Sequence, residues 1–193
     1  MVLILLKKLL LCFGALFIFV VGMNYQSCLA KSPYNYCFIG DSRFVGMEQA
    51  IDTDENIIWV NRNGANVNFY WEQRGYISSL DRDTVIIYEL GVNDLNSKGC
   101  IEALQDLEYL GFKHIYFTSV TPVDEAKEIE YGYRVQNSWI EEFNSVVRNN
   151  LPYSVASMDS YEYLTNMGFS TIDGVHYTNY TYQIWFDNII KSL

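Results

Sequence analysis

From Lys31 onward, short runs of β-branched or aromatic residues alternate with longer stretches that have helical periodicity. No internal repeat, low-complexity tract or linker rich in Pro and Gly interrupts this alternation. Such a pattern predicts one α/β domain, in which helices cover both faces of a parallel sheet. The expected strands span residues 36–39, 57–60, 84–90, 114–119 and 154–158. The third is the most apolar, so we expect it at the centre of the sheet.

The expected helices span residues 44–51, 67–76, 100–110, 133–150 and 180–192. The fourth helix has the clearest pattern, because six apolar residues fall on one stripe at helical spacing. We interpret this stripe as part of the core; its members are Val135, Trp139, Ile140, Phe143, Val146 and Val147. The segment from Thr121 to Tyr133 follows the fourth strand, and we expect it to be a loop that forms one lip of a site.

Residues 1–30 have the features of an export segment rather than of the domain. Two lysines precede an apolar run from Leu9 to Met23, and a small-residue pattern ends at Ala30. This arrangement is typical of a signal peptide cleaved after Ala30. The apolar run is long for a signal peptide but shorter than the roughly 20 residues that cross a bilayer, so a retained membrane anchor is the alternative. We expect residues 31–193 to be secreted or held at the cell envelope.

Net charge limits the partners of this chain. The formal charge is −10. This value argues against nucleic acid or an anionic membrane surface as the main partner. An uncharged or weakly charged substrate is easier to reconcile with it. The sequence points to no protein partner.

The cysteines and histidines do not indicate a metal site. No Cys/His cluster has metal-ligand spacing, and no glycine-rich phosphate loop follows the first strand, so we expect neither a metal nor a nucleotide cofactor. Cys37 lies inside the first strand, whereas Cys100 lies beyond the end of a later one. We therefore expect two free thiols.

The turn Gly40-Asp41-Ser42-Arg43 joins the first strand to the first helix. A serine on such a turn is held out of the sheet, beside backbone N–H groups that can stabilise an oxyanion. A Gly-Asp-Ser turn also caps helices for structural reasons alone, so this segment does not decide the function. We assign Asp41, and likewise Asp94, a structural role as acceptors of backbone N–H groups.

Other polar segments follow later strands. Ligands of open parallel sheets bind beyond the carboxyl ends of the strands. His176 is the only plausible general base, because the one other histidine of the domain, His114, begins the fourth strand at the opposite edge. Asp173, three residues before His176, can fold back onto the imidazole. The segments at the functional edge are 61–66, Gly91-Val92-Asn93-Asp94 and Asp173-Gly174-Val175-His176.

Together and in this order, these segments resemble the SGNH (GDSL-type) hydrolase family. The matching positions are Gly40-Asp41-Ser42, Gly64, Gly91-Val92-Asn93-Asp94 and Asp173-Gly174-Val175-His176. The resemblance covers nearly all of residues 34–193. It implies a three-layer α/β/α domain with a five-stranded parallel sheet in the order 2-1-3-4-5. It also implies ester hydrolysis or acyl transfer.

The resemblance assigns a role to each site residue. Ser42 is the expected nucleophile, His176 its general base and Asp173 the residue that orients the imidazole. The backbone N–H groups of Ser42 and Gly64, with the Asn93 side chain, are expected to form the oxyanion hole. Arg43 stands where the family's motif has leucine. It either pairs with an acid or contacts an anionic substrate group, and we favour the pairing.

Export and a serine site predict an esterase that removes small acyl groups, preferably O-acetyl, from a carbohydrate. Several aromatic residues suit stacking on sugar rings, although for any one of them we favour packing in the core or at its rim. They are Tyr70, Trp71, Tyr76, Tyr161 and Tyr163. The alternatives are an O-acyltransferase with a sugar hydroxyl as acceptor and a lipase- or thioesterase-type hydrolase. A catalytically silent glycan-binding module is disfavoured, because no member of the catalytic set is missing.

Overall fold

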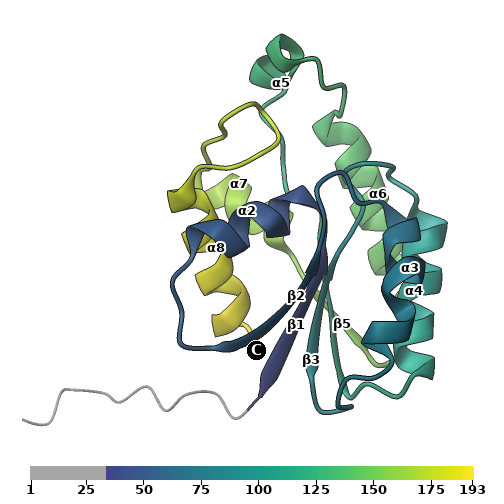
Figure 1. The fold of residues 1–193 in the computed structure, drawn as a ribbon. Coiled ribbons are helices and arrows are strands. Elements are labelled where there is room, and N and C mark those ends of the chain that lie inside the picture. Colours follow the sequence, from purple (N-terminus) through teal and green to yellow (C-terminus); the bar gives the residue numbers. More distant parts are fainter. Residues whose placement is uncertain (1–33) are drawn as a thin grey trace, which may run out of the picture. The chain divides into compact units, whose positions relative to one another are not determined.

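The computed structural model describes residues 34–193, so the predicted export segment at residues 1–30 lies outside the described residues. Five strands form one sheet in the order β2-β1-β3-β4-β5 (Figure 1). All of its strand pairs are parallel. The predicted sheet and strand order are therefore confirmed. The strands are β1 (Asn35–Gly40), β2 (Asn56–Asn61), β3 (Val85–Glu89), β4 (His114–Thr118) and β5 (Val155–Met158).

Helices cover both faces of the sheet, as predicted for a three-layer domain (Figure 1). One face packs against α2 (Ser42–Ala50), α7 (Ser160–Met167) and α8 (Asn179–Lys191). The other face packs against α3 (Val67–Ile77), α4 (Ser97–Tyr109) and α6 (Asn137–Asn149). A further short helix, α5 (Glu125–Tyr131), stands at the top of Figure 1.

The strands supply alternate residues to two cores. In β1, Phe38 faces the core under α2 and α8, whereas Ile39 faces the core under α3, α4 and α6. Ile87 and Ile86 of β3 divide in the same way, because successive side chains of a strand point to opposite faces. Every residue of β3 is buried, which confirms its predicted central place.

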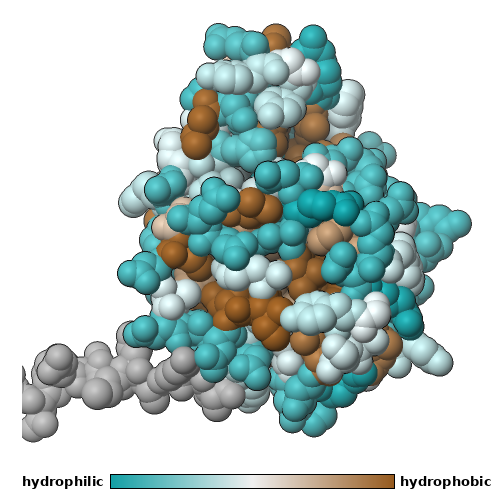
Figure 2. Space-filling view, in the orientation of Figure 1, coloured by the Kyte–Doolittle hydropathy of each residue, from teal (hydrophilic) through white to brown (hydrophobic). Residues whose placement is uncertain are grey.

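The edge strand β2 is less completely covered. Four of its six residues are half-buried. In the face shown by Figure 2, hydrophobic residues gather near the middle and hydrophilic residues surround them. Among residues 34–193, no helix combines the length and the apolar character needed to span a bilayer. Cys37 and Cys100 are buried and unpaired, as expected, and burial raises the pKa of the Cys37 thiol to about 12.

Three expectations about the helices were wrong. The segment 121–133 is not all loop, because it contains α5, and the unexpected α7 follows β5. Both helices are short and bury few residues: Glu128 in α5, and Ser160 and Leu164 in α7. The helix predicted at 133–150 begins at Asn137, and its stripe is narrower than expected, since Trp139 and Val146 are exposed.

The segment around α5 packs tightly on the loop that carries Asp173 and His176. The backbone N–H of Asp124 donates to the Gly174 carbonyl at 2.8 Å, and Lys127 Nζ donates to the Thr171 carbonyl at 2.6 Å. Gly174 has a φ of +97°, and a Cβ on it would clash with the backbone of Glu128. Glycine is therefore required at this position by both backbone conformation and close approach.

We predict that Gly174→Ala separates α5 from this loop and displaces His176. Its matched control is Gly111→Ala, which has a similar φ of +86° but open space around the added carbon. The control is expected to lose about 1 kcal/mol of stability through backbone strain alone. Gly174→Ala should lose about 1–3 kcal/mol more, measured by urea denaturation, because the clash adds to the strain. Equal losses would show that the packing against Glu128 does not matter.

Candidate active site

Ser42 is the first residue of α2 and follows directly on β1. Asp41 caps this helix: its carboxylate accepts the backbone N–H of Arg43 at 2.9 Å, which confirms the structural role predicted for it. The first turn of a helix has backbone N–H groups without intrahelical acceptors. Ser42 is thus presented at the edge of the sheet, next to donors that suit an anion.

The structure brings Ser42, His176 and Asp173 into one chain of hydrogen bonds. Nε2 of His176 lies 2.8 Å from the Ser42 hydroxyl oxygen, and its Nδ1 lies 2.6 Å from Asp173 Oδ2. The other oxygen of Asp173 accepts the backbone N–H groups of His176 and Val175. The carboxylate therefore holds both the imidazole and the turn beneath it. His114, as expected, begins β4 and lies outside this arrangement.

The ionisation of Asp173 sets the tautomer of His176. Partial burial raises the pKa of the Asp173 carboxyl, but hydrogen bonds from His176 and Val175 outweigh this effect and hold the pKa below its usual value. An ionised carboxylate only accepts hydrogen bonds, so Nδ1 of the neutral imidazole carries the proton. Nε2 is then free to take the proton of the Ser42 hydroxyl.

Gly64 and Asn93 follow the two strands that neighbour β1, the strand before Ser42. Gly64 follows β2 and Asn93 follows β3, and these two strands flank β1. Nδ2 of Asn93 donates to the Ala65 carbonyl at 2.8 Å, so the two loops meet. An amide nitrogen has two hydrogens, so Asn93 keeps a second donor. Asp94 accepts the backbone N–H of Val67 at the start of α3, in the structural role predicted for it.

Arg43 points into the protein interior and is fully buried. Its Nη1 donates to the carbonyl and the hydroxyl of Thr121, at 2.7 and 2.8 Å, and lies 4.0 Å from Glu89. The guanidinium also lies 5.6 Å from the centre of the Tyr177 ring. Arg43 therefore lies beside an acid, as favoured from the sequence, although neither carboxyl oxygen of Glu89 accepts a hydrogen bond. Burial rules out contact with a substrate anion.

Two buried carboxyls accompany Arg43. Burial raises the pKa of Asp41 to about 6, although Arg43 opposes this shift. Burial, and then the nearby Asp41, raise the pKa of Glu89 well above its usual value, again against the effect of Arg43. The three side chains form one electrostatic unit beneath the nucleophile.

A pocket of about 220 Å³ opens beside Ser42 and His176. Several of its residues were not expected from the sequence, although sequence position points to two of them. Gln49 lies seven residues after Ser42, which places both on one face of α2. Asn63 directly precedes Gly64. The further lining residues are Val45, Gly46, Ile172, Tyr177, Asn179 and Tyr182.

The aromatic residues proposed as sugar platforms do not line this pocket. Tyr70 is buried and Tyr161 donates to Glu141, whereas Trp71 and Tyr76 are exposed on α3. The segment from Thr121 to Tyr133, which was predicted to form one lip of the site, reaches the site through Tyr133. Its ring lies edge-on to the His176 ring, with 6.2 Å between the centroids, and its hydroxyl donates to Asp173 at 3.4 Å.

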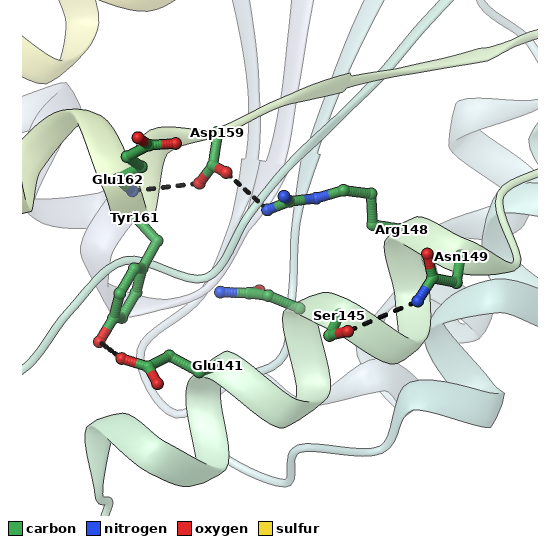
Figure 3. A pocket seen from close by; sticks show the side chains of 8 residues that line it. Glu141, Ser145, Arg148, Asn149, Asp159, Tyr161 and Glu162 are labelled. Atoms are coloured by element: carbon green, nitrogen blue, oxygen red, sulfur yellow. Dashed lines mark hydrogen bonds and ion pairs between the residues drawn. The ribbon is translucent and has the colours of Figure 1, made fainter.

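A second pocket lies between α6 and α7, and several of its lining residues form ion pairs and hydrogen bonds with one another (Figure 3). Arg148 pairs with Asp159 at 2.7 Å, and the Tyr161 hydroxyl donates to Glu141 at 2.6 Å. Its lining contains no nucleophile paired with a base. The pocket at Ser42 is therefore the candidate active site.

Comparisons with known proteins agree with this fold. No protein-family model and no curated protein matches the sequence. Among solved structures, a proposed platelet activating factor from Streptococcus pneumonia aligns with a TM-score of 0.67 and 20% identity, over 86% of each chain. A GDSL-like lipase from Bacteroides thetaiotaomicron aligns with a TM-score of 0.64 and 18% identity, over 82% of this chain and 86% of the lipase. The chain has the fold of the GDSL-like hydrolases.

An acetyl xylan esterase also has this fold, with a TM-score of 0.56 and 15% identity, over 82% of this chain and 99% of the esterase. The fold implied by the SGNH resemblance is thus the fold that the structure has. The three alignments cover 82% to 86% of this chain.

We predict that Asp41→Asn removes a pH-dependent part of the stability. Asparagine caps helices as well as aspartate does, so the cap is kept. The pKa of Asp41 is higher in the folded protein than in the unfolded chain, so the folded state binds more protons between about pH 4 and pH 6. The wild-type free energy of unfolding should therefore fall, relative to that of the variant, as the pH rises through this range.

Urea denaturation of both proteins at pH 4, 5, 6 and 7 measures this difference. A difference that stays constant with pH would contradict the raised pKa of Asp41.

Proposed function

We propose that residues 34–193 form a serine esterase that removes small acyl groups, preferably acetyl, from a carbohydrate. The observation that carries this proposal is the chain of hydrogen bonds from Asp173 through His176 to Ser42. A serine hydroxyl is a weak nucleophile until a base takes its proton, and this geometry supplies the base together with the group that orients it.

In the first step, Ser42 Oγ attacks the ester carbonyl while His176 Nε2 takes the hydroxyl proton. The carbonyl oxygen becomes an oxyanion, for which the backbone N–H groups of Ser42 and Gly64 and the second amide hydrogen of Asn93 are the donors. The positive end of α2 adds to this stabilisation. His176 then gives its proton to the departing alcohol oxygen, which leaves the acyl group on Ser42.

In the second step, water attacks the acyl-enzyme. His176 takes a proton from this water and returns it to Ser42 as the acid leaves. Tyr133 and the backbone N–H groups of His176 and Val175 hold the Asp173 carboxylate throughout, so the imidazole keeps its orientation.

The size of the pocket supports a small ester substrate. About 220 Å³ is less than the roughly 300–1,000 Å³ of pockets that enclose drug-sized ligands. A pocket of this size encloses one small group or ring beside Ser42, so it suits a small ester better than a long-chain lipid. The acetyl xylan esterase with this fold provides a precedent for acetyl removal from a glycan. Export through residues 1–30 is part of the proposal, because it would bring the domain to envelope or external glycans.

Hydrolysis of nitrophenyl acetate tests the activity. We expect the purified domain to release nitrophenol and Ser42→Ala to lose at least about a thousandfold in kcat, with its fold retained by circular dichroism. A wild type without activity, or a fully active Ser42→Ala, would refute the esterase proposal. Incubation with acceptor sugars separates the alternative, because an acyltransferase would form a new sugar ester instead of free acetate.

We predict that Asn93→Ala lowers kcat about 100-fold to 1,000-fold, because it removes one oxyanion donor. KM should change little, since the donor acts mainly on the transition state. Asn96→Ala is the matched control: Asn96 caps α4 three residues further along the chain. The control should lose about 1 kcal/mol of stability but keep its kcat. Equal kcat values for the two variants would remove Asn93 from the oxyanion hole.

A further inference from the structure

The pocket beside Ser42 contains three side-chain amides. Gln49 lies on the face of α2 that also carries Ser42, Asn63 lies in the turn before Gly64, and Asn179 begins α8. All three are exposed. No lysine, arginine, aspartate or glutamate lines this pocket.

The other polar groups of the pocket already have hydrogen-bond partners. Ser42 and His176 bind each other. The Tyr177 hydroxyl donates to the Pro122 carbonyl, and the Tyr182 hydroxyl accepts the backbone N–H of Tyr177. Among residues 34–193, the side-chain amides of Gln49, Asn63 and Asn179 make no hydrogen bond within the protein. They are the polar groups that remain free for a ligand.

The polar groups of the pocket in Figure 3 differ from these three amides, because they have partners within the protein. There the Arg148 guanidinium, the Asp159 carboxylate and the Tyr161 hydroxyl are all taken up by ion pairs and hydrogen bonds between lining residues. A ligand in that pocket would have to break these interactions. A ligand beside Ser42 only replaces water at the three amides.

Three amides match the alcohol side of an ester better than its acyl side. An acetyl group has one polar atom, its carbonyl oxygen, and that atom belongs in the oxyanion hole. Its methyl group would cover the amides without offering hydrogen bonds, which is unfavourable. The hydroxyls of a sugar both donate and accept, as amides do. Val45 and Ile172 provide apolar contacts for the C–H groups of the ring.

We propose that this pocket binds the alcohol portion of the ester as an uncharged, hydroxyl-bearing ring, held by the amides of Gln49, Asn63 and Asn179. The proposal rests on the esterase function proposed above and adds the substrate subsite to it. Ser42 and His176 border the same pocket, so a ring seated there brings its ester bond to the nucleophile. The absence of charged lining residues selects against phosphorylated or carboxylated alcohols.

The test compares two esters in wild type, Gln49→Met and Asn179→Leu. One is a methyl glycoside that carries a single acetyl group and free hydroxyls; the other is the same compound with those hydroxyls methylated. We expect wild type to prefer the free-hydroxyl ester. Each variant should lower the ratio of kcat/KM for the free-hydroxyl ester to kcat/KM for the methylated one by about tenfold, mainly through KM.

Gln105→Met is the matched control, because Gln105 is an exposed glutamine on α4 and does not line this pocket. Its substrate ratio should equal that of wild type. An unchanged ratio in Gln49→Met and Asn179→Leu would overturn the subsite. A gain of activity on nitrophenyl butyrate relative to nitrophenyl acetate in these variants would also overturn it, because the pocket would then hold the acyl chain.

The result distinguishes the subsite from the underlying function. If wild type hydrolyses both glycosides but the ratios do not change, the subsite is wrong and the esterase stands. If wild type hydrolyses neither glycoside nor nitrophenyl acetate, both proposals fail.

Discussion

The geometry of the site depends on the contacts that the buried guanidinium of Arg43 makes. Arg43 directly follows Ser42, donates to Thr121 beyond β4, faces Glu89 at the end of β3 and lies against Tyr177, the neighbour of His176. One cation thus connects the ends of three strands with the loop of the general base. A buried charge is costly unless it is paired, so Arg43 also holds these segments in a single arrangement.

A second set of contacts fixes the loop that contains Asp173 and His176. Asp124 and Lys127 bind the backbone of the loop that contains Asp173 and His176, and Gly174 allows α5 to approach that loop closely. This contact supports the loop at Thr171 and Gly174, and Arg43 contacts it at Tyr177. His176 therefore reaches Ser42 from a loop that has little freedom to move, which is the preorganisation that nucleophilic catalysis requires.

The parallel sheet and the residues at its functional edge were predictable, because apolar runs and the turn residues after them are local signals; the strand order followed only from the resemblance to the SGNH family. The short helices α5 and α7 were not, because neither presents a broad apolar stripe; only the caps Asp124 and Gly132 mark α5 in the sequence. The arrangement of Arg43 depends on Thr121, 78 positions further along the chain, which no local pattern reveals. The aromatic residues considered for sugar stacking do not line the pocket, and the sequence could not decide this, because aromatic residues serve cores and surfaces alike.

The central claim is that Ser42 is a nucleophile activated by His176. Labelling of the purified domain with an alkyl fluorophosphonate, followed by mass spectrometry of its peptides, tests this claim most directly. We expect a single covalent adduct on Ser42, formed much more slowly in His176→Ala. An adduct on another residue with Ser42 unmodified, or no adduct at all in folded wild-type protein, would contradict it.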